Sequence, residues 1–212
     1  MKTLSFLATG CAVLFPIPLS LSGQTSLGFQ GGLSLATLGG SDVEDMDPGY
    51  KTGFGLGAFL ELPVSDVLSI QPELLYLQKG AEGSEQGVNI TVAISYVELP
   101  VLLRINVPVE GNVAPYFVVG PAISFKAGCE VTGEGGGVEV KIDCDEAEAE
   151  IKSVDFGGVV GAGLSFGAGP GNIHVGARFN YGLTTLDDSE YDEDVKNQAF
   201  SLLAGYSFPV GG

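Results

Sequence analysis

Residues 172–184 alternate strictly between apolar and polar side chains. Ile173, Val175 and Ala177 belong to the apolar set, and His174 and Arg178 to the polar set. A period of two is typical of a β-strand whose two faces meet different environments. Seven further segments share this pattern, and no segment with helical periodicity competes with them. The eight predicted strands cover residues 25–37, 51–62, 67–79, 90–107, 114–127, 152–166, 172–185 and 197–208.

The connections between these strands alternate between short and long. The short turns cover residues 63–66, 108–113 and 167–171, and the long loops cover residues 39–50, 80–89, 128–151 and 186–196. An even number of strands with short turns at one end is typical of a transmembrane β-barrel. A closed barrel also satisfies every backbone hydrogen-bonding group in lipid. We therefore predict an all-β, eight-stranded, antiparallel up-and-down transmembrane barrel with short periplasmic turns and long acidic extracellular loops.

Charge and composition narrow the class of protein further. The chain has 26 Asp and Glu against 9 Lys and Arg, and twenty of these acidic residues lie in the four long loops. An acidic chain repels phosphate, so we expect no nucleic-acid partner. No stretch after residue 23 supplies the ~18 uninterrupted apolar residues of a transmembrane helix. Several lysines lie where predicted strands meet loops, and we expect them to reach toward lipid head groups. They are Lys51, Lys79, Lys126, Lys152 and Lys196.

The first 23 residues have the features of a secretory signal peptide. Lys2 supplies a positive charge, a mostly apolar stretch follows it, and small residues precede Gln24. A cleavable signal explains this composition better than a membrane anchor, because the apolar stretch is short and interrupted by proline. We therefore expect a signal peptide at residues 1–23 and a barrel domain at residues 24–212.

Three stretches resemble a known family. Residues 69–80 read SIQPELLYLQKG, residues 96–100 read YVELP, and residues 176–183 read GARFNYGL. Together they resemble the porin-family outer-membrane β-barrel proteins (PorT-like β-barrel domain) of Gram-negative bacteria. The resemblance implies an outer-membrane location, contact with membrane lipid, and assembly by the barrel assembly machinery. Most members have no assigned activity. Such barrels usually end on an aromatic residue, whereas Phe208 is followed here by four further residues.

Polar side chains on the predicted inward faces are the candidate site. They are Gln71, Glu73, Glu98, Arg104, His174 and Arg178. Eight strands leave an interior that is only wide enough for side chains to fill. An isolated charge there is costly, so we predict that the carboxylates and guanidinium groups pair in one network that plugs the lumen. A gated proton or ion path and hydrolysis by paired carboxylates are the alternatives. Since a plugged barrel has no cleft for a substrate, we expect no enzyme.

Two cysteines flank the longest predicted loop. Cys129 and Cys144 are the cysteines that remain after removal of the signal peptide, in an oxidising compartment. We predict a disulfide that closes a hairpin in this loop. Within the loop, apolar residues at 138, 140 and 142 alternate with charged residues at 139 and 141. The hairpin is therefore expected to extend beyond the membrane with an exposed strand edge.

The acidic loop at residues 39–50 is a weak candidate for cation binding. It carries Asp42, Glu44, Asp45 and Asp47, without the strict spacing of a calcium loop. Solvated loops, or adaptation to a high-salt habitat, explain the same acidity without a ligand. We expect no cofactor and no dedicated metal site.

Three functions fit these features. The first is a structural or interaction role at the cell surface, with the barrel as an anchor. The second is a narrow passive pore for ions or small solutes. The third is a soluble barrel that binds a small ligand, which would require apolar residues inside and polar residues outside. The sequence identifies no surface partner.

Overall fold

The computed structural model is a single antiparallel sheet of nine strands. It describes residues 23–43, 48–85, 87–144, 146, 151–188 and 194–210. The strands are β1 (Ser26–Gly39), β2 (Lys51–Pro63), β3 (Leu68–Glu85), β4 (Val88–Asn106), β5 (Val113–Gly135), β6 (Val138–Asp143), β7 (Val154–Ala168), β8 (Gly171–Gly182) and β9 (Lys196–Pro209). The described residues contain no helix long and apolar enough to cross a membrane. Apart from Gly23, the predicted signal peptide lies outside these residues.

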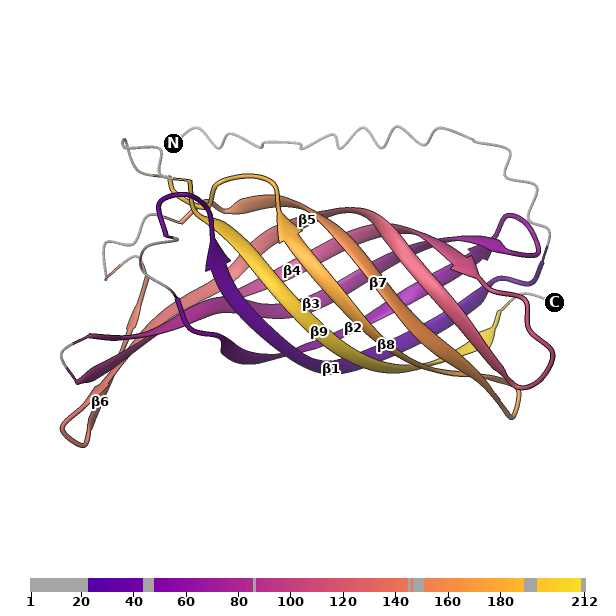
Figure 1. The fold of residues 1–212 in the computed structure, drawn as a ribbon, viewed down its shortest axis with the longest axis horizontal. Coiled ribbons are helices and arrows are strands. Elements are labelled where there is room, and N and C mark those ends of the chain that lie inside the picture. Colours follow the sequence, from indigo (N-terminus) through magenta and orange to yellow (C-terminus); the bar gives the residue numbers. More distant parts are fainter. Residues whose placement is uncertain are drawn as a thin grey trace, which may run out of the picture.

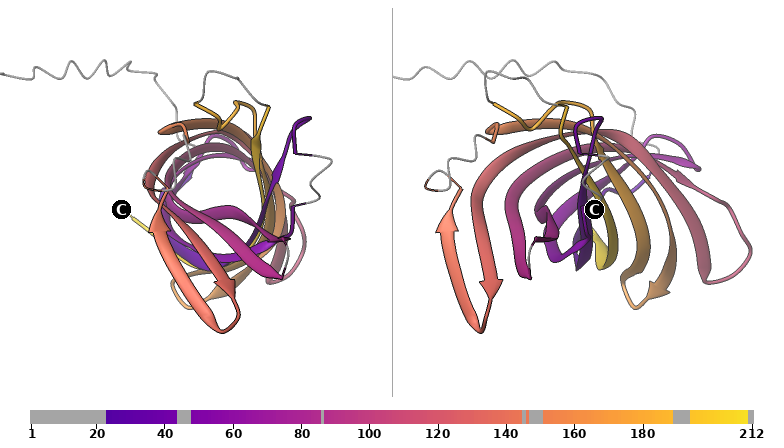
Figure 2. Two further views of the ribbon diagram at one scale, coloured as in Figure 1. Left: turned by 90° about the vertical axis from the view of Figure 1, so that its left-hand side faces the viewer. Right: turned by 60° about the vertical axis from the view of Figure 1, so that its left-hand side comes forward.

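Eight of the strands close into a barrel (Figure 1, and the left view of Figure 2). β1 pairs with β2 on one side and with β9 on the other, and the remaining strands follow in chain order. β5 pairs with both β4 and β7, which completes the ring. β6 pairs with β5 outside the ring and ends the sheet. The predicted eight-stranded antiparallel barrel is confirmed, with one additional strand.

The two faces of the barrel wall differ as the alternation predicts. Leu33, Leu56 and Phe117 are exposed on the outside, while Gln71 and Arg104 are buried inside. Successive residues of a strand point to opposite faces, so one period-two pattern separates the two sets. An outer apolar surface suits lipid. It is the reverse of what a soluble small-ligand-binding barrel requires.

Three strands run further than the sequence pattern predicts. β3 and β4 continue through the predicted loop at 80–89, where Glu82 pairs with Thr91 and Glu85 pairs with Val88. The glycine-rich, polar composition of this segment is typical of a loop, yet the backbone ladder persists until a tight turn at Gly87, whose φ is 84°. β5 likewise extends to Gly135 and turns into β6, so most of the predicted loop at 128–151 is strand as well.

These extensions form a small sheet beyond one end of the ring, here called the projecting sheet (Figure 1). It consists of residues 81–85, 88–92, 131–135 and 138–143. Cross-strand partners point to the same face of a sheet, so the registers group the residues into rows. On one face, the first row is Ala81, Val92, Val131 and Ile142, and the second row is Gly83, Ile90, Gly133 and Val140. The opposite face carries the rows Glu82, Thr91, Thr132, Lys141 and Ser84, Asn89, Glu134, Glu139. The projecting sheet is therefore apolar on one face and polar on the other.

The polarity of the outer surface changes along β4. Leu99 and Val101 are exposed on the outside of the barrel, whereas Thr91 and Asn89, at the same alternating positions, lie on the polar face of the projecting sheet. Its apolar face continues the lumen side, where Tyr96 is fully buried. Because a lipid-facing surface must be apolar, this change marks the point at which the strands leave the membrane.

Candidate functional site

A buried ion pair crosses the barrel lumen. Arg178 of β8 places its Nη1 atom 2.6 Å from Oε2 of Glu73 of β3. The amide of Gln30 donates to the same oxygen at 2.7 Å, and the amide of Gln71 donates to Oε1 at 2.6 Å. The side chain of Glu73 has no exposed surface. This carboxylate therefore accepts hydrogen bonds from one charged and two neutral donors, which offsets its loss of hydration.

Arg104 lies beside this ion pair and bonds mainly to neutral groups, with a longer ion pair to Glu61. Its Nη1 donates to Oε1 of Gln71 at 3.1 Å, and its Nη2 donates to Oγ of Ser165 at 2.7 Å. Its nearest carboxylate is Glu61, with 3.5 Å between Nε and Oε1. The guanidinium carbon also lies 3.8 Å from the ring centroid of Tyr116. A planar guanidinium can stack on a ring and use its in-plane donors at the same time.

His174 joins the serines on either side of it to this cluster. Its Nδ1 atom is 2.8 Å from Oγ of Ser165, and its Nε2 atom is 2.7 Å from Oγ of Ser207. Nη2 of Arg104 is 3.3 Å from Nδ1. Five of the six predicted lumen residues, Gln71, Glu73, Arg104, His174 and Arg178, thus lie in one connected cluster, here called the lower cluster.

Glu98, the sixth predicted residue, lies in a separate cluster closer to the long-loop end. Its Oε2 atom is 2.7 Å from Nζ of Lys79 and accepts from Oγ of Ser124 at 2.9 Å. Its Oε1 atom accepts from Nδ2 of Asn180 at 2.7 Å. We call these four residues the upper cluster. The single network expected from the sequence is therefore divided in two, because the counter-ion of Glu98 is a lysine of the neighbouring strand.

Lys79 corrects an expectation from the sequence. It was expected to reach toward lipid head groups from the end of a strand, but it is only 4% exposed and points into the lumen. Lys51, for which the same was expected, is also buried, with 7% of its surface exposed. The error for Lys79 follows from the predicted end of the strand at residue 79, since β3 continues to Glu85. Lys79 has the same alternation parity as Gln71 and Glu73, and this parity was the signal that could have placed it inside.

Asp155 and Asn197 are also buried and were missed by the sequence analysis, and they lie beyond the upper cluster. Asp155 accepts from Oγ1 of Thr184 at 3.0 Å and from Nδ2 of Asn197 at 2.9 Å. The same Nδ2 atom is 3.1 Å from the hydroxyl of Tyr96. The charge of Asp155 is thus surrounded by neutral donors. Asp155 belongs to the polar set of its alternating strand, and this was the signal that could have found it. Asn197 and Thr184 carry no charge that would have singled them out in the sequence.

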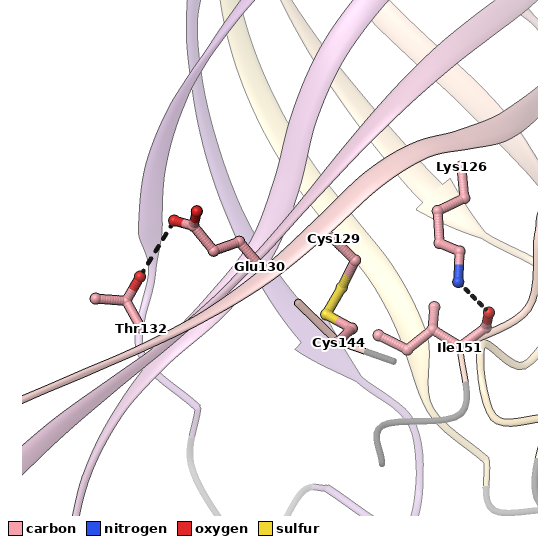
Figure 3. Close-up of a disulfide and its surroundings, with 6 residues drawn as sticks. All are labelled: Lys126, Cys129, Glu130, Thr132, Cys144 and Ile151. Atoms are coloured by element: carbon pink, nitrogen blue, oxygen red, sulfur yellow. Dashed lines mark hydrogen bonds between the residues drawn. A yellow bond between two sulfur atoms is a disulfide. The ribbon is translucent and has the colours of Figure 1, made fainter. Parts of the chain in front are cut away.

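The two candidate cysteines are bonded in the structure (Figure 3). Cys129 belongs to β5, Cys144 follows β6, and their Cα atoms are 5.4 Å apart. Both pack with Ile94, Tyr96 and Leu186 in a hydrophobic cluster under the rim of the barrel. The disulfide therefore joins the base of the projecting sheet to the barrel wall.

The candidate acidic loop is only partly described. Glu44, Asp45 and Asp47 lie outside the described residues. Oδ2 of Asp42 accepts a hydrogen bond from the backbone N–H of Asp194 at 2.6 Å. Within the part of the chain that the structure describes, no group of three His, Cys, Asp or Glu side chains is arranged to hold a metal ion.

Asp194 is held in its ionised form at this rim. The side chain of Lys196, 2.6 Å away, and the backbone N–H of Ser41 both hydrogen-bond to the carboxylate, and they lower the pKa of Asp194 from its ordinary value. Together with the bond to Asp42, these contacts connect two acidic loops that leave the adjacent strands β1 and β9.

Solved structures with the same fold come from Gram-negative bacteria. Neisserial surface protein A (NspA) gives a TM-score of 0.50 at 13% identity, over 87% of this chain and 97% of its own. OprG of Pseudomonas aeruginosa gives 0.48 at 9% identity, over 88% and 97%. Ail, the attachment invasion locus protein of Yersinia pestis, gives 0.44 at 17% identity, over 88% and 100%. At these identities the likeness concerns the fold alone.

Sequence comparison gives the family. No curated protein matches the chain. The sequence model of the outer membrane protein beta-barrel domain matches residues 20–188. The narrower PorT-like assignment stays a prediction. The chain therefore belongs to the outer membrane protein beta-barrel domain family, whose members are located in the outer membrane.

Proposed function

We propose that this protein is a membrane-anchored surface interaction protein whose lumen is plugged by its own side chains. One observation carries the plug. In the ring, β3 and β8 are separated by β2, β1 and β9 on one side and by β4, β5 and β7 on the other. The ion pair of Glu73 with Arg178 therefore joins opposite walls of the barrel, which supports a lumen that is closed at this level.

The upper cluster supports the same conclusion. Glu98 of β4 and Asn180 of β8 meet across the interior. The cavity beside them, also lined by Lys79 and Ser124, has a volume of about 10 Å³. That is close to the space that one water molecule needs. An ion that passed this level would have to break at least one buried charge-assisted hydrogen bond.

The interaction role rests on the projecting sheet. A plugged barrel offers lipid an apolar outer wall and offers its surroundings only the segments beyond the membrane. Among the described residues, the projecting sheet is the largest segment there, and the apolar residues Val138, Val140 and Ile142 of β6 are exposed on it. Exposed apolar surface rimmed by polar residues commonly marks a site of protein interaction.

We propose no catalytic role. The contact of His174 with Ser165 has the atoms of a nucleophile and a base, but both side chains lie inside the lower cluster. Arg104 donates to Ser165 and the ring of Tyr116 contacts that of His174, so both groups already have partners inside the barrel.

For assembly, we propose that the barrel assembly machinery recognises the last strand, β9, in spite of its displaced aromatic end.

A narrow passive pore is the second candidate, and one observation favours it. On the inner face of the barrel, beside Arg178, Oγ of Ser34 and Oγ of Ser201 are buried without a hydrogen-bond partner among the described residues. Ser34 and Ser201 are cross-strand neighbours on β1 and β9. Buried hydroxyl groups commonly bond to ordered water, so this level of the lumen would be wet.

Single-channel recording in a planar bilayer distinguishes the two candidates. The wild-type protein should show no steady conductance at low voltage. Glu73→Ala/Arg178→Ala/Glu98→Ala, which removes the crossing ion pair and the carboxylate that holds the upper cluster together, should show measurable conductance. Lys141→Ala, which alters only an exposed residue of β6, is the matched control and should remain closed. Steady conductance of the wild-type protein would refute the plug and favour the pore.

A further inference from the structure

The outer edge of β6 is an unusual feature in this molecule. The barrel has no free edge because its eight strands form a closed ring, but β6 ends the sheet within the described residues. Figure 1 and the right view of Figure 2 show it at the margin of the projecting sheet, clear of the ring. Val138 and Val140 are 61% and 55% exposed. An exposed edge with β-branched residues is a template for another strand.

The backbone phase of β6 shows which residues face outward. The N–H of Cys144 donates to the carbonyl of Cys129, so this pair is hydrogen-bonded. Hydrogen-bonded and non-hydrogen-bonded pairs alternate along an antiparallel ladder. Ile142 and Val140 therefore direct their backbone groups toward β5, and Glu139 and Lys141 direct theirs away from the sheet.

The side chains of β6 match a second copy of the same strand. We propose that β6 pairs antiparallel with β6 of another copy of this protein, with Val140 facing Val140 on a two-fold axis. In this register Glu139 faces Lys141 of the other copy, twice by symmetry, and Val138 faces Ile142. The outward backbone groups of Glu139 and Lys141 then form the hydrogen-bonded pairs of the new ladder.

The neighbouring registers lack this match. A two-fold axis at residue 139 would place glutamate opposite glutamate, and an axis at residue 141 would place lysine opposite lysine. Like charges directly opposite each other destabilise an antiparallel pair, whereas opposite charges stabilise it. An axis at residue 142 would also set opposite charges against each other, Lys141 opposite Asp143, but it would pair only three residues of each β6, whereas the axis at Val140 pairs five. The sequence of β6 therefore favours the register centred on Val140, in which the apolar faces of the two projecting sheets become continuous.

The net charge of the chain and its anchoring in a membrane determine whether this pairing occurs in solution or at the membrane surface. A formal charge of −17 keeps two chains apart in dilute solution. Anchoring in a membrane raises the effective concentration of the edges, so a short contact can persist there. The inference rests on the proposed surface-interaction role and names its partner as a second copy of this chain.

Disulfide cross-linking of the full chain in lipid vesicles tests the register. In the proposed dimer the two Cα atoms of residue 140 lie about 4.5 Å apart, within the range that a disulfide spans. Val140→Cys should therefore cross-link to a covalent dimer under mild oxidation. Val138→Cys is the matched control on the same strand and face. Its two copies lie roughly 13 Å apart, too far for a bond, and it should stay monomeric.

Charge exchange tests the partner contact within the Val140→Cys background. Adding Lys141→Glu places like charges opposite each other in two pairs and should slow cross-linking about tenfold. Adding Glu139→Lys as well restores opposite charges and should recover the rate. All three side chains are exposed in the monomer, so each variant should fold normally.

Several results would overturn the proposal. One is equal cross-linking of Val140→Cys and Val138→Cys, or no cross-linking of either. Another is a cross-linking rate that stays the same when Lys141→Glu, or Lys141→Glu with Glu139→Lys, is added to Val140→Cys. A monomeric chain that instead binds a different protein along β6 would assign the edge to that partner and also overturn the proposal. None of these results alters the conductance assay, so failure of the dimer and failure of the plug are separable.

Discussion

Replacing Arg178 by methionine removes the cation from the bond that crosses the lumen. In the wild-type structure, Nη1 of Arg178 is 2.6 Å from Oε2 of Glu73, whose side chain is fully buried. Methionine keeps most of the volume and the apolar stem, so the main change is the loss of charge. The carboxyl group of Glu73 then keeps only the amides of Gln30 and Gln71 as hydrogen-bond donors.

The expected cost follows from this geometry. Removing one partner of a buried ion pair destabilises a protein by about 3–5 kcal/mol, since an uncompensated charge stays behind. The two remaining amide donors place Arg178→Met near the lower limit, at about 3 kcal/mol. Glu73→Gln in addition removes the unpaired charge. The double variant should therefore be less destabilised than Arg178→Met alone, with a coupling energy of about 2 kcal/mol.

Equilibrium unfolding in denaturant, with the protein in lipid vesicles and strand content followed by circular dichroism, measures these differences. Lys141→Met is the control, because its partner Glu139 is about as exposed as Lys141 itself, and it should change stability by less than about 0.5 kcal/mol. The reasoning is refuted if Arg178→Met costs no more than this control, or if the double variant is less stable than Arg178→Met.

Three further predictions follow from the other contacts. Lys79→Met should destabilise the barrel by about 3 kcal/mol in the same unfolding assay, because its buried glutamate partner loses its cation. Replacing Cys129 and Cys144 together by serine opens a link with a sequence separation of 15 and should cost about 3 kcal/mol, seen as faster amide exchange in β5 and β6. The hydrogen bond from Lys196 lowers the pKa of Asp194 in the folded protein. The stability that this bond contributes should therefore be complete above the ordinary pKa of an aspartate and should disappear as the pH falls through the lowered pKa of Asp194. A titration by nuclear magnetic resonance that finds the ordinary or a higher pKa would contradict this.

Apart from the disulfide, these contacts depend on a pattern that the sequence already contained. Alternation with period two assigned six polar residues to the interior, and all six are buried there: Gln71, Glu73, Glu98, Arg104, His174 and Arg178. The physical reason is local. In a strand, the side chain of each residue points opposite to that of its neighbour, so parity alone separates lipid from lumen.

The ends of the strands were less accessible to sequence analysis. The polar, glycine-rich residues 80–89 have the composition of a loop, and only pairing with a neighbouring strand keeps them extended. Once β3 was predicted to end at residue 79, Lys79 was assigned to the lipid interface. Pairing is a property of two segments together, and composition of one segment does not report it.

The sequence by itself therefore determined that this chain forms an antiparallel barrel with a polar interior and an acidic long-loop end, because alternation, turn length and charge are local properties. Only the tertiary structure decided which charges pair. Glu98 bonds to Lys79 and not to an arginine, and Glu73 reaches across the ring to Arg178, because stagger and closure set the height of each strand relative to its distant neighbours. The free edge of β6 likewise exists only because the barrel closes without it.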